Sequence, residues 1–168
     1  MTMVNIRRGL VLLTVLVLAS CGFKLRGAVT LPFDSIYLQA GTSPLVTQLK
    51  RAITAGSQTR IADKPGEAQV MLQILSEARE KQILALSGGG RVREFELRYR
   101  VSYRLTDGKS ATEYIAPSEI LLRRELSYSD VEALAKESEE ALLYRDMQTD
   151  AVQQLVRRLQ VARVTTKS

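Results

Sequence analysis

The sequence contains no histidine and no tryptophan, and its single cysteine is Cys21. Without histidine or a second cysteine, the chain has no serine-histidine-aspartate or cysteine-histidine catalytic system, no histidine or thiolate metal site and no internal disulfide bond. Carboxylate pairs or a serine-lysine pair remain possible, but no spacing singles one out. We therefore expect no catalytic residues, no metal site and no cofactor.

Long apolar runs are also scarce, and the main one lies near the N-terminus, from Leu10 to Leu18. Nine residues are too few for a permanent transmembrane helix, which takes about 20 apolar residues. The run follows Arg7 and Arg8, and a basic start before a short apolar stretch is typical of a secretory signal. It closes with Leu18-Ala19-Ser20-Cys21, which resembles the lipobox of bacterial lipoproteins. We expect residues 1–20 to be a signal peptide and Cys21 to carry lipid, rather than to be a buried thiol.

The remaining residues, 21–168, have a length that suits one domain with a single core. They carry 22 basic and 18 acidic residues, a mild excess of positive charge. An exported chain that is tethered to a membrane does not meet nucleic acid, so an anionic lipid or an acidic protein surface is the better partner class. Residues 21–32 have no clear periodicity and contain Gly27 and Pro32. We expect them to be a lipidated tether, followed by one domain at residues 33–168.

In the first half of this domain, alternating apolar residues predict a strand at residues 35–40 and a second strand from residue 70 to about residue 86. Between the strands, Ser43 followed by Pro44 marks the start of a helix, and Gly56 marks its end. The apolar residues of this helix recur four apart, at Leu45, Leu49 and Ile53.

The clearest pattern in the chain follows the three glycines at 88–90. Apolar residues alternate strictly with polar or charged residues from Glu94 to Leu105, which predicts a strand with one buried and one solvated face. Asp107-Gly108 is the favoured dipeptide of a two-residue hairpin turn, so residues 112–126 should return antiparallel. Pro117 cannot donate a hydrogen bond within a sheet, which places it at an edge or a bulge.

The C-terminal part of the sequence predicts a long helix. Ser129 and Glu132 have the spacing of a capping box. An apolar stripe then recurs every four residues, at Leu143, Met147, Ala151, Leu155 and Leu159. The element order predicts an α+β fold: a two-layer sandwich of about four mostly antiparallel strands with two helices packed on one face.

Three stretches resemble the family of LPS-assembly lipoproteins called LptE. The segment Cys21-Gly22-Phe23-Lys24-Leu25-Arg26 is similar to the opening of the mature family members. Ala133-Leu134-Ala135-Lys136-Glu137 is similar to the entry into their last helix, and residues 144–159 are similar to the rest of that helix. The element order agrees along the whole mature chain.

The resemblance implies a protein without catalytic activity in the outer membrane of Gram-negative bacteria. It implies that the chain forms a one-to-one complex inside the LptD β-barrel, as plug and assembly partner, and that it contacts lipopolysaccharide during transport to the cell surface. It also implies attachment to the membrane through the N-terminal lipid. Gly22 is not the aspartate that commonly retains lipoproteins at the inner membrane, which is consistent with outer-membrane placement.

The resemblance also indicates candidate residues for binding lipopolysaccharide. Lys136 matches a basic residue of the family in its local sequence. The family has a second basic position in the loop between the second and third strands, where Arg91 and Arg93 follow the glycines of this chain. Lysine and arginine form charge-assisted hydrogen bonds with phosphate groups such as those of lipid A. The alternative is that these residues are ordinary solvated side chains, as is also possible for Arg98, Arg100 and Arg104 on the third strand.

Two other functions remain open on the residues alone. One is a lipoprotein adaptor of a different envelope complex, which only the identity of the partner distinguishes from the LptE role. The other is an enzyme that faces the periplasm and uses carboxylates such as Glu94 and Glu96. An enzyme of this kind requires a deep pocket in which carboxylates converge.

Overall fold

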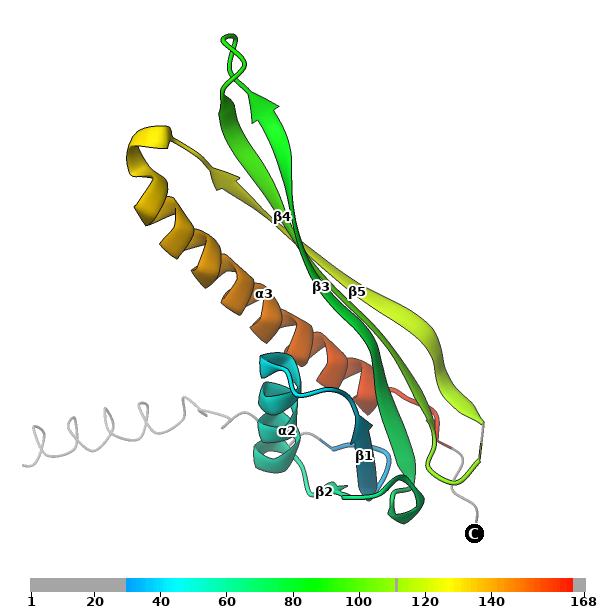
Figure 1. Ribbon diagram of the computed structural model, residues 1–168. Coiled ribbons are helices and arrows are strands. Elements are labelled where there is room, and N and C mark those ends of the chain that lie inside the picture. Colours follow the sequence, from blue (N-terminus) through cyan, green and yellow to red (C-terminus); the bar gives the residue numbers. More distant parts are fainter. Residues whose placement is uncertain (1–29, 111, 165–168) are drawn as a thin grey trace, which may run out of the picture.

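The computed structural model describes residues 30–110 and 112–164. The predicted signal peptide, Cys21 and the tether up to residue 29 lie outside this part of the chain. The tether's last residues, 30–32, are described, and Leu31 among them is buried in the core. The elements follow one another as β1 (Ser35–Gln39), α2 (Pro44–Gly56), β2 (Arg60–Ile61), η1 (Pro65–Glu67), β3 (Val70–Leu86), β4 (Val92–Asp107), β5 (Glu113–Ser127), η2 (Asp130–Glu132) and α3 (Ala133–Gln160) (Figure 1).

The strands form a single mixed sheet in the order β2-β1-β3-β4-β5. β3 pairs antiparallel with β4, and β4 with β5, whereas β1 runs parallel to both of its neighbours. The helices lie on one face of the sheet (Figure 1). The predicted α+β class is confirmed. The sheet has one strand more than the expected four, because the two residues of β2 are too few to show an alternating pattern.

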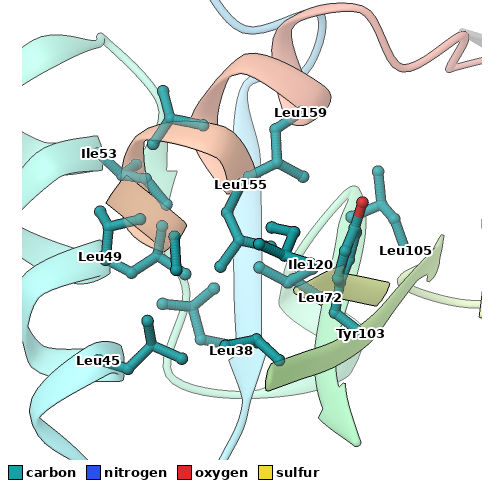
Figure 2. Close-up of a cluster of buried hydrophobic side chains, with 14 of the residues drawn as sticks. Leu38, Leu45, Leu49, Ile53, Leu72, Tyr103, Leu105, Ile120, Leu155 and Leu159 are labelled. Carbon is teal, nitrogen blue, oxygen red and sulfur yellow. The ribbon is translucent and has the colours of Figure 1, made fainter. Parts of the chain in front are cut away.

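The core lies between the sheet and the two helices. β4 presents alternate residues to it, and all of them are fully buried: Leu97, Tyr99, Val101, Tyr103 and Leu105. Leu155 and Leu159 of α3 pack near Tyr103 and Leu105, while Leu45, Leu49 and Ile53 approach from α2 (Figure 2). The apolar stripe predicted for α3 is therefore the surface that holds the helix on the sheet.

Helix α2 begins and ends where the sequence predicts. Ser43 is the N-cap, and its Oγ accepts a hydrogen bond of 3.3 Å from the backbone N–H of Val46. Pro44 occupies the first helical position. A backbone N–H group at this position has no partner within the helix, so its absence in proline costs no hydrogen bond. The helix ends at Gly56.

Two expectations, one about a turn and one about a helix cap, are wrong. Asp107-Gly108 does not form a two-residue hairpin turn, because β5 resumes pairing only after the backbone N–H of Asp107 donates to Thr112 O at 2.8 Å. The Asp107 carboxylate accepts hydrogen bonds from the N–H groups of Lys109 and Ser110 and so stabilises a wider turn. Ser129 makes no side-chain cap, and Glu132 N donates to Ser129 O in the 3-10 geometry of η2 instead of a capping box.

Pro117 lies where the sequence places it, on the edge strand β5. The register between β4 and β5 shifts between Tyr103 and Leu105, whose partners are Ser118 and Ile115. Pro117 falls in this irregular stretch, so its missing donor interrupts no regular pair.

None of the helices in the described part of the chain combines the length and the apolar composition that crossing a membrane takes.

Candidate functional site

The end of the molecule farthest from β2 is a projecting β-hairpin. β5 stops at Ser127, which pairs with Glu94, so β3 and β4 continue beyond this point as two strands alone (Figure 1). The turn is closed by a hydrogen bond of 2.7 Å from Ser87 N to Arg91 O. Gly90 has φ of 78°, a left-handed conformation that favours glycine. We call residues 81–93 the hairpin tip.

The hairpin tip carries positive charge only, in Lys81, Arg91 and Arg93. Arg91 and Arg93 are exposed, and among the residues that the structure describes neither has a carboxylate within 4.0 Å. Lys81 differs, because its Nζ lies 2.6 Å from Glu140 Oε2 and 4.2 Å from the centre of the Phe95 ring. The two arginines are thus the cations of this end that remain available to an external anion.

Lys136 lies at the base of the same hairpin. Its Nζ donates to Ser127 Oγ at 2.9 Å and pairs with Glu139 Oε2 at 2.9 Å, which leaves the side chain only 15% exposed. The neighbouring Tyr128 N donates to Arg93 O at 2.7 Å. The structure therefore brings the three predicted basic residues to one end. The charge of Lys136 is already partly compensated.

Apolar residues at this end are the feature that sequence reasoning missed. In the hairpin tip, Ile83, Leu84 and Leu86 are 58, 46 and 57% exposed. In η2 and at the start of α3, Val131 and Leu134 are 95 and 81% exposed. The signal was present as an aliphatic run next to three glycines, but such a run also fits a strand that is covered by a helix.

Helix α3 reaches β3 just below the hairpin tip. The hydroxyl of Tyr144 donates to the backbone carbonyl of Glu80 at 2.7 Å. The guanidinium of Arg79 lies 5.8 Å from the ring centre of Tyr99 and 5.4 Å from that of Tyr144. Burial is the main cause that raises the pKa of both tyrosines above the usual value. These contacts fix the helix against the root of the hairpin.

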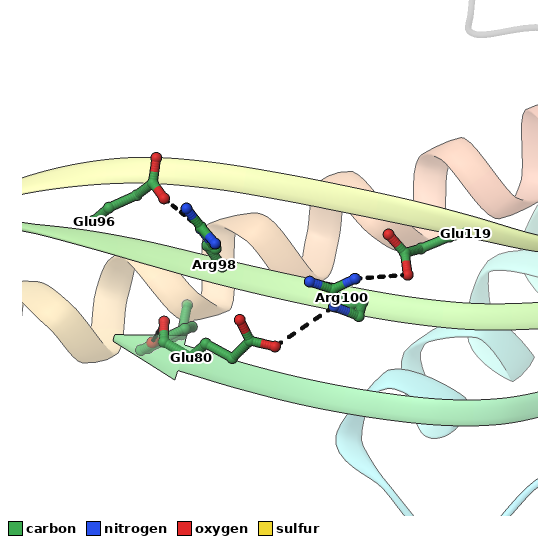
Figure 3. Close-up of polar contacts among 6 residues, drawn as sticks. Glu80, Glu96, Arg98, Arg100 and Glu119 are labelled. Carbon is green, nitrogen blue, oxygen red and sulfur yellow. Dashed lines mark hydrogen bonds and ion pairs between the residues drawn. The ribbon is translucent and has the colours of Figure 1, made fainter. Parts of the chain in front are cut away.

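The solvated face of the sheet carries several arginine and glutamate pairs. Arg100 bridges two neighbouring strands, with Nη1 at 2.9 Å from Glu119 and Nε at 3.5 Å from Glu80 (Figure 3). Arg98 pairs with Glu96 on its own strand. The hydrogen bond to Glu119 is the main cause that raises the pKa of Arg100. On this face, glutamates of the same sheet compensate the charges of Arg98 and Arg100, whereas Arg123, the exposed cross-strand partner of Arg98, has no carboxylate within 4.0 Å among the described residues.

The carboxylates proposed for an enzyme do not converge in a pocket. A hollow of about 810 Å³ lies at the opposite end of the sheet, and its lining includes Asp34, Glu67 and Asp107 but neither Glu94 nor Glu96. Hydrogen bonds, first that from the Lys109 N–H, hold the pKa of Asp107 below its usual range, which suits a turn cap rather than a general acid. Within the described ranges, no three acidic or cysteine side chains are grouped to hold a metal ion.

Comparison with known proteins identifies the family. The family model described as LptE, lipopolysaccharide-assembly, matches residues 33–159. A protein of Photorhabdus laumondii named LPS-assembly lipoprotein LptE is 28% identical over 153 residues, which cover 88% of this chain and 81% of that protein. The protein of the same name from Yersinia enterocolitica is 29% identical over 154 residues, which cover 89% of this chain and 72% of that protein.

Solved structures agree with this result. The solution structure of uncharacterized lipoprotein B from Nitrosomonas europaea is 44% identical, with a TM-score of 0.72 over 83% of this chain and 90% of that one. The crystal structure of the rare lipoprotein B from Shewanella oneidensis, 22% identical, shares the fold with a TM-score of 0.63 over 75% of this chain and 93% of that one. The chain therefore belongs to the LptE lipopolysaccharide-assembly family.

Proposed function

We propose that this protein is a lipid-anchored component of the outer membrane that plugs the LptD β-barrel, assists its assembly and contacts lipopolysaccharide through the hairpin tip. The observation that carries the proposal is the pair of exposed guanidinium groups, Arg91 and Arg93, in the hairpin tip, whose residues 81–93 include no acidic residue. Guanidinium groups form paired hydrogen bonds with phosphate oxygens. Lipid A, the membrane-embedded part of lipopolysaccharide, carries such phosphates.

The plug role is supported by the solvated face of the sheet. The lumen of an outer-membrane barrel is polar, so a domain inside it should present polar groups. On this face the charges of Arg98 and Arg100 are compensated by glutamates of the same sheet. Such a polar surface, with ion pairs at Arg98 and Arg100, suits a polar lumen.

The proposal is tested by affinity purification of the full-length protein from detergent-solubilised membranes, with the bound partner identified by mass spectrometry. We expect recovery of LptD in a one-to-one ratio. Membranes that lack the tagged protein provide the control. Recovery of a different envelope complex, without LptD, would refute the plug role and favour an adaptor function.

Replacing both Arg91 and Arg93 with glutamine should weaken binding of lipopolysaccharide by at least tenfold. The reason is that a hydrogen bond to a charged group contributes about 1.5–3 kcal/mol, and about 1.4 kcal/mol is a tenfold change in affinity. Binding is measured by titration of the full-length protein with purified lipopolysaccharide. The matched control replaces Arg157 and Arg163, two exposed arginines near the end of α3, and should bind as the wild type does.

Lys136 provides an internal comparison for this experiment. Because its ammonium group already pairs with Glu139 and donates to Ser127, its replacement by glutamine should weaken binding less than the double arginine change. Equal binding by the wild type and the double arginine variant would contradict the proposed contact.

A further inference from the structure

Helix α2 lies beside the second half of α3, at the end of the molecule opposite the hairpin tip (Figure 1). The side chain of Gln48 joins the two helices: its Nε2 donates to Thr149 Oγ1 at 3.0 Å, and its Oε1 accepts a hydrogen bond of 2.9 Å from Gln148. Farther along both helices, Ile53 and Leu155 point into the same part of the core (Figure 2). The last turns of both helices therefore form one surface layer.

The outer side of this layer carries positive charge only. Residues 35–62, which include α2, contain no acidic residue, and neither do the residues from Ala151 onward. Arg158 is turned toward the sheet, where its guanidinium donates to the Tyr103 hydroxyl at 2.7 Å. The exposed cations of the layer have no carboxylate within 4.0 Å among the described residues, and we call them the basic patch: Lys50, Arg51, Arg157 and Arg163.

Helix dipoles alone do not account for the basic patch. Cations are favoured in the last turn of a helix, which explains Arg157. Lys50 and Arg51 lie in the middle of α2, where the dipole gives no such preference. Acidic residues of the same end, among them Asp34 and Glu67, line the hollow at the end of the sheet. The patch is thus an uncompensated positive surface that fits an anionic partner.

The chain enters the domain close to this layer. Phe33 is buried, and its carbonyl oxygen accepts a hydrogen bond of 3.0 Å from Thr59 Oγ1, in the loop directly after α2. The segment between Cys21 and the first described residue is 22–29, which can span at most about 26–29 Å. A lipid on Cys21 therefore keeps the basic patch within reach of the membrane that the lipid enters.

We propose that the basic patch lies on the headgroups of anionic phospholipids in the membrane that holds the lipid anchor. The inference rests on the lipid anchor of the proposed function and adds a second contact with the same membrane. Lysine and arginine near an anionic membrane surface are attracted to it, and the attraction fades within a Debye length of about 8 Å. The anchor fixes one point of the chain, whereas the patch orients the domain, with the hairpin tip pointing away from this surface.

This contact differs from binding at the hairpin tip. Attraction to a membrane surface is diffuse and needs many headgroups in one plane. It therefore does not add to the binding of a single lipopolysaccharide molecule by the tip, for which variants of Arg157 and Arg163 remain a valid control.

The test uses the lipidated full-length protein in vesicles. Because Cys21 is the only cysteine and its thiol is blocked by lipid, Thr54→Cys on the exposed side of α2 can be labelled selectively with a fluorophore. Energy transfer to acceptor lipids reports how close the label lies to the membrane. We expect strong transfer in vesicles with phosphatidylglycerol and weak transfer in phosphatidylcholine alone, and about 1 M salt should remove the difference. A label at Gly89→Cys, in the hairpin tip, should show weak transfer in both.

Replacing all residues of the basic patch with glutamine should lower energy transfer from position 54 to the level found in phosphatidylcholine. Exchanging lysine for arginine, and arginine for lysine, within the patch should leave the transfer unchanged, because diffuse attraction depends on charge and not on the shape of the guanidinium group. The matched control removes the same charge at exposed arginines elsewhere and should also leave it unchanged: Arg91, Arg93, Arg123 and Arg145.

Equal transfer from position 54 in anionic and neutral vesicles would overturn the inference and leave an acidic protein surface as the partner of the patch. An equal loss in the patch variant and the control variant would also overturn it, because net charge alone would then govern the contact. Failure of the lipid anchor is recognised separately, since the protein would leave the vesicles at about 1 M salt. Binding of the two variants to phosphatidylglycerol vesicles at low salt then decides: weaker binding by the patch variant supports the inference, and equal binding refutes it.

Discussion

Replacing Leu155 with alanine is expected to lower the free energy of unfolding by about 3 kcal/mol. Leu155 is fully buried in the middle of the stripe that holds α3 against the sheet. Removing a buried leucine side chain costs about 2–5 kcal/mol, because transfer free energy is lost and a cavity remains. The cost should be large here, since the core cluster that contains Leu155 is built from the sheet and both helices, which cannot close over a cavity without moving the helix. Urea denaturation followed by circular dichroism measures the change.

The control for this prediction is Leu142, on the same helix but 55% exposed. Its replacement by alanine should change the free energy of unfolding by less than about 1 kcal/mol, because little apolar area leaves water at this position. Similar effects at the two positions would show that the packing of α3 on the sheet is not what stabilises the helix.

The second large effect is expected at Gly108, where alanine should destabilise the protein by about 2 kcal/mol or more. A Cβ at this position would lie 2.0 Å from the carbonyl oxygen of Ala68 and 2.8 Å from its carbonyl carbon. Both are backbone atoms, so the loop after β4 would have to move away from the entry to β3 and lose the 2.9 Å hydrogen bond from Gly108 N to Gln69 O. Overpacking of this kind typically costs about 1–3 kcal/mol, and the lost hydrogen bond adds to it.

Gly41 is the matched position, because a Cβ there would meet no atom within 4 Å. Alanine at residue 41 should be neutral or slightly stabilising, since it reduces the conformational freedom of the unfolded chain. Thermal unfolding of both variants measures the difference. A Gly108→Ala protein as stable as the wild type would show that the two loops separate at little cost.

Gly108 also illustrates what the sequence predicts and what it does not. The dipeptide Asp107-Gly108 correctly indicated a chain reversal and an antiparallel return. The reason for the glycine, however, is the close approach of Ala68, a residue 40 positions earlier, and not a positive φ. Contacts between residues so distant in the sequence leave no local pattern.

The elements with strong local patterns were predicted closely. The alternation along β4 gave the buried face of the sheet, and the serine and proline before α2 gave its start. The parallel pairing of β1 with β3 was missed by the expectation of a mostly antiparallel sheet, although a helix between two neighbouring strands is the usual connection of a parallel pair. Ser129 failed as a cap because the chain forms a short 3-10 turn before α3.

In the candidate site, too, some features were predicted from the sequence and others depend on the assembled fold. Arg91 and Arg93 were candidates through the family resemblance, because they follow the glycines of the loop in which the family has a basic position. The pairing of Lys136 with Glu139 follows from helix geometry, whereas its hydrogen bond to Ser127 depends on the position of β5. The exposure of Ile83 and Leu86 depends on where α3 begins relative to the hairpin, which only the assembled fold determines.

The projecting hairpin also has a thermodynamic consequence. A two-stranded ribbon on its own is marginally stable in water, because each backbone hydrogen bond lacks a neighbouring strand to shield it. Beyond Glu94 the protein has only such a ribbon, joined to a sheet that a helix covers. Opening should therefore require less free energy at the turn than anywhere along the core part of β4. A ligand that contacts both strands would stabilise the closed ribbon as it binds. The fraction of tips with bound ligand and the fraction with an ordered backbone should therefore increase together.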